Sequence, residues 1–190
     1  TLIETYASGG EGRYLTNSVS EIYLGKHSSL THLKVQKESE QAFHISSTLV
    51  TQDEDSSYFS LLVDIGGRLV RNNLSVKLDG QGASANLNGL YLLTRDQHVD
   101  YSTFIDHVVP NTHSAELYKG VLGGKAHAVF GGKMLIRPGA QKITSYQTNK
   151  TLLLSEGSGV DTKPQLEIYA DDVKCGHGAA IGQIDPEALF

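Results

Sequence analysis

The sequence lacks several features that mark other classes of protein. It has one cysteine in 190 residues, so an internal disulfide is excluded, and this usage is typical of a reducing compartment. No apolar run approaches the roughly 20 residues that a membrane-spanning helix needs. Residues 1–6 are typical of a strand and do not resemble a signal peptide. We therefore expect a cytoplasmic protein that has no membrane partner.

The chain also has no excess of positive charge. Charged residues make up 19% of the sequence and give a formal net charge of −5. Nucleic acids and anionic membranes are bound through a positive surface potential, so the composition predicts that neither is a partner. A length of 190 residues suits one domain with a sizeable core.

Short runs in which every second residue is apolar recur along the chain, which is the period of a strand with one buried face. Four such runs have their apolar residues at 59–65, 74–78, 126–130 and 166–170, and we expect these residues to be buried. Turn-forming pairs separate the runs: Asp79-Gly80, Pro110-Asn111, Gly123-Gly124, Gly131-Gly132 and Pro138-Gly139. No stretch before residue 185 sustains an apolar repeat of 3.6 residues, so the chain is predicted to be nearly all β.

Similar segments recur about 30 residues apart, at 88–92, 119–122 and 149–153. A repeat of this length suits a coil of a β-helix with two or three strands per turn. These patterns fit a β-sandwich about equally well, so both architectures stay open at this point. In a solenoid, residues one repeat apart lie on neighbouring coils, and on this ground we consider a stack of His107 on His127.

The most informative stretch contains the only cysteine, Cys175, with His177 two residues later. Residues two apart on a strand point to the same face, and sulfur and imidazole nitrogen suit iron, zinc or copper(I). Two ligands complete at most half of a metal site, so a partner or an external thiol has to complete it. Lys174 and His177 are expected to lower the pKa of the thiol and favour the thiolate.

The alternative is that Cys175 is a small core residue, because free cysteine is among the most buried residue types. Gly176 and Gly178 favour a strand end or edge over a packed interior. The sequence alone leaves both interpretations open.

Residues 163–179 and 187–190 closely resemble motifs of the SufD branch of the SufB/SufD family, scaffold proteins of the SUF iron–sulfur cluster assembly system. Supporting family features follow in order at residues 16–19, 38–44, 66–72 and 137–141. The SufB branch has its key cysteine in an earlier strand, and the matching region here has none. The resemblance covers essentially the whole chain, and it favours a right-handed parallel β-helix, a solenoid, over the sandwich.

The resemblance implies a scaffold subunit that is not an enzyme. It implies pairing with a SufB-like paralogue through the β-helix edges, and binding of a SufC-like ATPase through a C-terminal helical domain. His177 would be the ligand at the SufB interface, with Cys175 in a supporting or redox role. We expect no cofactor in the isolated fragment and a transient iron–sulfur cluster in the full complex. Without the paralogue, the chain is expected to form a homodimer.

Two parts of the chain are expected: a β-helix core domain at 1–184 and the start of a helical domain at 185–190. Asp185-Pro186-Glu187 has the N-cap, the first-turn proline and the early acidic residue of a helix start. So few residues cannot form a stable helix, which is why we expect an excised middle domain.

Two other functions remain open. A β-helix enzyme acting on carbohydrates would need carboxylates or basic residues gathered on one face, and the sequence shows no repeated constellation of that kind. A purely structural β-solenoid that dimerises through its strand edge is the third possibility. Bound iron, or copurification with SufB-like and SufC-like proteins, would separate the scaffold from both.

Overall fold

The computed structural model describes residues 1–10 and 12–183, and these form strands joined by turns. The strands are β1 (Leu2–Ala7), β2 (Leu15–Leu24), β3 (Ser29–Lys37), β4 (Phe43–Gln52), β5 (Ser57–Asp64), β6 (Leu69–Leu78), β7 (Ser84–Leu93), β8 (His98–His107), β9 (His113–Leu122), β10 (His127–Ile136), β11 (Ile143–Leu153), β12 (Gly159–Ile168) and β13 (Val173–Gln183). The described residues include no helix that could cross a membrane. The all-β prediction is confirmed, while the expected helix start at 185–190 lies outside the described residues.

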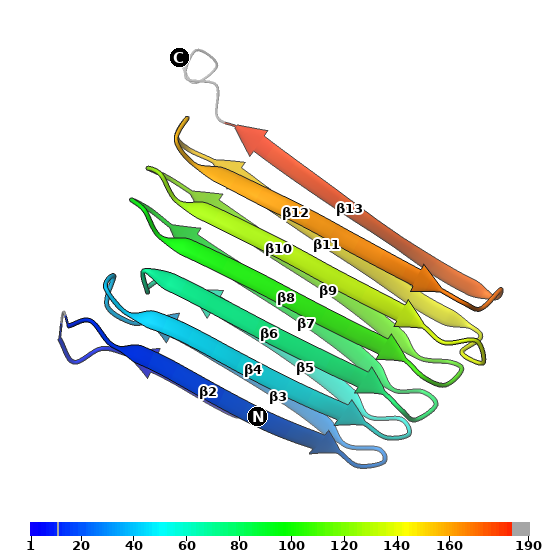
Figure 1. Cartoon of the computed structure of the whole chain (residues 1–190). Helices are drawn as coiled ribbons and strands as arrows, with labels where there is room; N and C mark the ends of the chain where they lie inside the picture. Colours follow the sequence, from blue (N-terminus) through cyan, green and yellow to red (C-terminus); the bar gives the residue numbers. More distant parts are fainter. Residues whose placement is uncertain (11, 184–190) are drawn as a thin grey trace.

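Consecutive strands alternate between two sheets, so that each pair of strands makes one coil (Figure 1). The odd-numbered strands form a seven-stranded sheet in the order β1-β3-β5-β7-β9-β11-β13, here called the odd sheet. The even-numbered strands form a six-stranded sheet from β2 to β12, the even sheet. Neighbouring strands within each sheet are parallel. The predicted parallel β-solenoid is confirmed, and the sandwich alternative is wrong.

The register agrees with the predicted repeat. Leu69 pairs with His98, and His98 pairs with His127, so each of these coils advances the chain by 29 residues. Stacking of histidines also occurs, although with a different pair. The rings of His98 and His127 lie 5.4 Å apart with 7° between their planes. His107 is at the other end of β8, opposite Ile136, so the stack of His107 on His127 is wrong.

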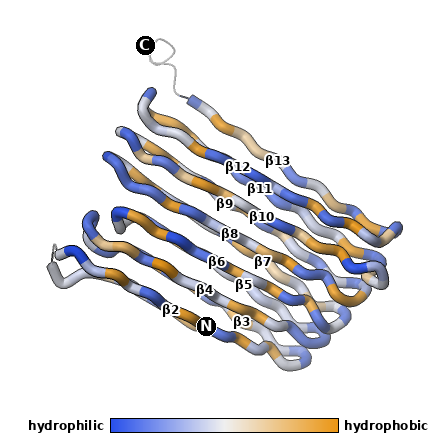
Figure 2. Tube along the Cα trace, viewed as in Figure 1, coloured by the Kyte–Doolittle hydropathy of each residue, from blue (hydrophilic) through white to orange (hydrophobic). Residues whose placement is uncertain are grey.

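Every second residue of the inner strands is buried in the lumen between the sheets, and polar and apolar residues alternate along much of the chain (Figure 2). A zigzag of aromatic rings crosses it from strand to strand, through Tyr91 on β7, Tyr101 on β8, Tyr118 on β9 and Phe130 on β10. Successive ring centroids are 5.4, 5.1 and 4.8 Å apart. These contacts join the two sheets through the lumen.

The predicted buried face is correct for two of the four runs. The apolar residues at 74–78 and 126–130 are buried, whereas at 166–170 they are half-buried or exposed. At 59–65 the prediction is wrong, because Phe59 is 37% and Ile65 44% exposed while Asp64 is buried.

Asp64 can lie in the lumen because its carboxylate is hydrogen-bonded. It accepts the side-chain N–H of Asn72 at 2.9 Å and the hydroxyl of Tyr101. Buried polar groups are tolerated where they find such partners. The lumen of the early coils thus takes polar residues beside apolar ones such as Leu62, while Phe59 and Ile65 lie on the outer surface.

Candidate functional site

Cys175 and His177 both lie on β13, the last strand of the odd sheet. Within residues 1–10 and 12–183, β13 pairs with β11 alone, and its other edge faces away from the stack of coils (Figure 1). The predicted extended conformation is confirmed. The site is on an edge strand and not at a strand end, since β13 continues to Gln183.

The register shows that both side chains belong to the lumen-facing side of the strand. Cys175 is paired with Ser145 and His177 with Gln147, and both of these partners are buried. The prediction that Cys175 and His177 share a face is therefore confirmed. Because no described coil follows β13, this part of the lumen is open and His177 is exposed.

Cys175 is only half-buried and packs against a small apolar cluster. The buried members of that cluster are Met134, Ile136, Ala140 and Ile143. Burial raises the pKa of the Cys175 thiol, and a backbone hydrogen bond from Ser145 opposes the rise. The prediction that Lys174 and His177 lower this pKa is wrong. Lys174 points to the opposite face of β13 and is exposed.

Cys175 and His177 supply one sulfur and one nitrogen donor. In the described part of the chain, no group of three His, Cys, Asp or Glu side chains lies close enough together to hold a metal ion. Iron–sulfur clusters take four cysteines or a mixture of cysteines and histidines. The arrangement can therefore offer part of a ligand set at an open edge, to be completed from outside.

Two buried residues that the sequence analysis did not single out lie in the same row as His177. Glu116 on β9 and Gln147 on β11 are in register with each other, and Gln147 is in register with His177. The side-chain amide of Gln147 donates a hydrogen bond to the Glu116 carboxylate. Their spacing, about one repeat from residue to residue, is the signal that could have identified them.

A second polar row lies behind Cys175. Ser145 shares a hydrogen bond with the hydroxyl of Ser114, which lies 3.0 Å from Nε2 of His107. The other ring nitrogen of His107 is 2.7 Å from the hydroxyl of Thr112. Burial lowers the pKa of His107 to about 4, so the imidazole is neutral at physiological pH and acts as a hydrogen-bonding group of the lumen.

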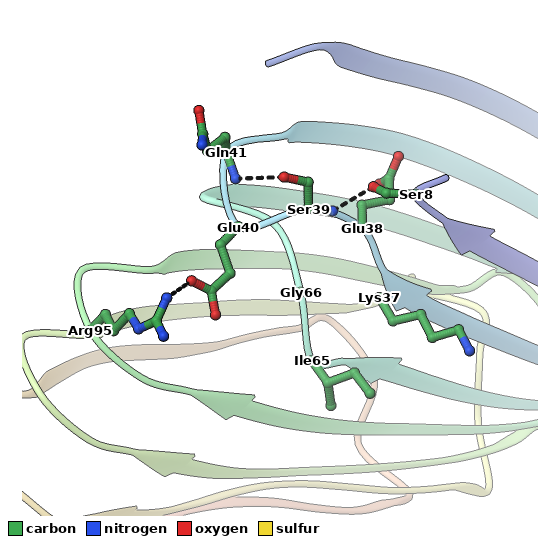
Figure 3. A pocket seen from close by; sticks show the side chains of 9 residues that line it. All are labelled: Ser8, Lys37, Glu38, Ser39, Glu40, Gln41, Ile65, Gly66 and Arg95. Carbon is green, nitrogen blue, oxygen red and sulfur yellow. Dashed lines mark hydrogen bonds and ion pairs between the residues drawn. The ribbon is translucent and has the colours of Figure 1, made fainter. Parts of the chain in front are cut away.

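A separate cavity of about 540 Å³ is lined by residues of the first coils and by Arg95 (Figure 3). The strand β13 lies at the other end of the solenoid (Figure 1). Several charged groups of the cavity are engaged in contacts within the protein. Glu40 forms an ion pair with Arg95, and the buried Glu38 accepts hydrogen bonds from Thr16 at 2.5 Å and His44 at 2.7 Å. Residues 38–44, one of the segments that carried the family resemblance, therefore have a structural role in these contacts.

The fold and the site together define a class: a parallel β-solenoid whose last described strand presents a thiol and an imidazole at an edge that no other described strand covers. Over residues 1–190 the sequence matches the family model described as "SUF system FeS cluster assembly, SufBD core domain". The chain belongs to this SufBD core family.

Among curated proteins, the chain is similar to the iron–sulfur cluster assembly protein SufD of Escherichia coli. The two are 35% identical over 190 residues, which is all of this chain and 45% of that protein. A SufBD family protein of Synechocystis is 36% identical over 177 residues, 93% of this chain and 39% of that protein. The chloroplastic protein ABCI7 of Arabidopsis thaliana is 36% identical over 183 residues, 95% of this chain and 38% of that protein. The chain thus spans less than half the length of these relatives.

Proposed function

We propose that the chain is the core of a non-catalytic scaffold subunit that takes part in iron–sulfur cluster assembly by the SUF system. The observation that supports this most directly is the placement of Cys175 and His177 on an open edge strand. A pair of donors at such an edge is suited to a cluster that is built between two chains, because neither chain holds it alone. The cluster is cargo, bound transiently in the full complex.

The proposed partner is a SufB-like paralogue that approaches β13. An edge strand offers unpaired backbone N–H and C=O groups to another strand. The outward side chains of β13 are small over much of its length, at Gly176, Gly178, Ala180 and Gly182. A second chain can therefore come close to the backbone here. When no paralogue is present, the same edge would favour a homodimer.

The resemblance to the family supports two further parts of the proposal. A SufC-like ATPase would contact the subunit through a helical region that follows the solenoid. The single free thiol fits a reducing compartment, the cytoplasm, as the place of action.

The test uses the full-length protein with its SufB-like and SufC-like partners, and it measures maturation of a SUF-dependent enzyme. His177→Ala should lower maturation by about tenfold or more, since removing even a supporting residue of a metal site often has that effect. Cys175→Ala should have a smaller effect if its role is supporting. His113→Ala is the matched control, because His113 is exposed on β9 of the same sheet, away from β13.

Melting temperatures of all three variants have to be compared with the wild type. The proposal is wrong if His177→Ala matures clusters normally. It is also wrong if His177→Ala loses activity only in proportion to a lower melting temperature.

A further inference from the structure

The outer face of the odd sheet is apolar over several neighbouring strands. On β3, β5 and β7, large apolar side chains alternate with the buried ones and therefore point away from the lumen: Leu33, Val35, Phe59, Leu61, Val63 and Leu90. The strand β5 is apolar on both of its faces, because Leu62 faces the lumen between Leu61 and Val63. Apolar residues on both faces are typical of a strand that is covered on both sides, whereas no described strand covers this outer face.

A hollow of about 410 Å³ lies on the same face, near the start of the strands. Its floor follows one register row, from Phe59 on β5 through Asn86 on β7 and Ala115 on β9 to Tyr146 on β11. The two aromatic residues are at the ends of the row, and the smaller side chains lie between them. Three steps between neighbouring strands span about 14 Å. This width accommodates an α-helix with its side chains, which is about 10–12 Å across.

The charges on this face all have the same sign. On the described strands of the odd sheet, every Asp, Glu, Lys or Arg that points outward is a lysine: Lys37, Lys119, Lys150 and Lys174. Lys119 and Lys150 are register partners on β9 and β11. Neither forms an ion pair with a described residue. Like charges opposite each other on neighbouring strands are destabilising, so this face is suited to a negatively charged partner.

The outer face of the even sheet has a different distribution of charge. There, Arg71 forms an ion pair with its register partner Asp100. Lys133 on β10 likewise forms an ion pair with Glu167 on β12, at 2.8 Å. Acidic side chains are thus present on the outer face of the even sheet, and the described strands of the odd sheet have none on theirs. The positive charge of the odd sheet is a property of that one face, in a chain whose net charge is −5.

We propose that the outer face of the odd sheet binds an acidic amphipathic helix of a partner protein. The apolar stripe of the helix lies on β5 and β7 and fills the hollow between Phe59 and Tyr146, as amphipathic helices do in apolar grooves. Carboxylates on the flank of the helix pair with Lys119 and Lys150, which lie four residues beyond Ala115 and Tyr146 on the same two strands. This surface is separate from Cys175 and His177, so the inference goes beyond the proposed cluster site.

The composition of the face favours a separate protein over two other occupants. A second copy that docked through the same face would bring lysines together without a carboxylate, which opposes association. A segment packed there permanently would call for a more apolar surface, because obligate interfaces are more hydrophobic than those that form and dissociate. Here apolar side chains are mixed with Asn86, His113 and exposed lysines, a mixture that is also stable in water.

The experiment measures binding of a fluorescent peptide to the full-length protein by fluorescence anisotropy. The probe is a helical peptide of about 18 residues, roughly 27 Å long and close to the length of the strands, with leucines on one face and glutamates on the other. One control peptide has the same composition in scrambled order, and a second has lysine in place of every glutamate. The acidic amphipathic peptide should bind at least about tenfold more tightly than either control.

Variants of the protein locate the binding surface. The double variant Lys119→Glu/Lys150→Glu should weaken binding of the acidic peptide by about tenfold, because two attractions become repulsions. Tyr146→Ala should weaken it by about fivefold or more, as the loss of an aromatic anchor does. Lys163→Glu is the matched control, because Lys163 is exposed on β12 of the even sheet, and it should leave the affinity unchanged.

Three results would overturn the proposal. The first is that the acidic and basic peptides bind equally well, or that the double variant binds the acidic peptide as the wild type does. The second is that phosphatidylserine vesicles bind to this face more tightly than the peptide does, since the partner would then be a membrane. The third is that the wild type binds no peptide and the double variant has a lower melting temperature, because another segment of the full-length protein would then cover the face.

Discussion

The ring of Tyr91 lies against the backbone of Gly120, its register partner on the next coil. A Cβ at Gly120 would come within 1.9 Å of Cε2 of Tyr91. Two residues away, the glycine and the tyrosine exchange strands: a Cβ at Gly89 on β7 would lie 2.2 Å from Cδ1 of Tyr118 on β9. The strand β7 thus contributes Gly89 and Tyr91, and β9 contributes Tyr118 and Gly120. Each tyrosine ring occupies the volume that a side chain on the glycine paired with it would need.

Gly120→Ala should therefore destabilise the protein. The added methyl group forces the Tyr91 ring out of its place in the aromatic zigzag, and overpacking of this kind costs about 1–3 kcal/mol. Gly131→Ala is the matched control, because the nearest atom to a Cβ there is 3.8 Å away. Urea denaturation of the two variants measures the difference. Equal midpoints would mean that the lumen around Tyr91 is not closely packed.

The alternation of the sequence predicts strands well but does not say which side of a strand faces the lumen. On β5, the row that contains Phe59 and continues to Ile65 just after the strand is apolar, and the row that contains Asp64 is mixed, yet the mixed row is inside. The reason is that Tyr101 and Asn72, contributed by other coils, satisfy the carboxylate of Asp64. Such partners are brought together by the register, which local periodicity does not reveal.

The candidate site shows the same division between local and long-range information. The extended conformation that places Cys175 and His177 on one face is a local property, and it is confirmed. The environment of the thiol depends on Met134 and Ile136, which lie about 40 residues earlier in the sequence and pack beside it through the solenoid. The raised pKa of Cys175 follows from that packing. The charged residues next to Cys175 in the sequence therefore do not determine its pKa.

The burial of residues on and beside β5 and β6 can be tested by truncation. Leu78 is fully buried, and Leu78→Ala should lower the free energy of unfolding by about 2–5 kcal/mol. Ile65→Ala removes a side chain that is 44% exposed, so its effect should stay below about 1 kcal/mol. Chemical denaturation distinguishes the two. A larger effect at Ile65 than at Leu78 would contradict the burial described here.

Asp64 should make stability fall as the pH rises through the acid range. Burial raises its pKa from 3.8 to about 6 in the folded protein. The folded state therefore holds the proton more tightly than the unfolded state, and ionisation between pH 3.8 and about 6 removes up to roughly 3 kcal/mol of stability. Asp64→Asn should abolish this contribution, since the amide oxygen can still accept from Tyr101. Asp96→Asn, at an exposed position, is the control, and the measurement is the unfolding free energy at several pH values.

His107 should act on stability with the opposite sign. Burial lowers its pKa from 6.5 to about 4, so the folded state binds the proton less tightly than the unfolded state. Its contribution is present above pH 6.5 and is lost as the pH falls toward 4, by up to roughly 3 kcal/mol. This window overlaps that of Asp64, so the two effects partly cancel in the wild type and only the single variants separate them. His107→Gln should make stability less sensitive to acid over this range, while His27→Asn, at an exposed position in another coil, should leave the profile unchanged. If His107→Gln shows the same dependence of stability on pH as the wild type, the imidazole is not held neutral in the lumen.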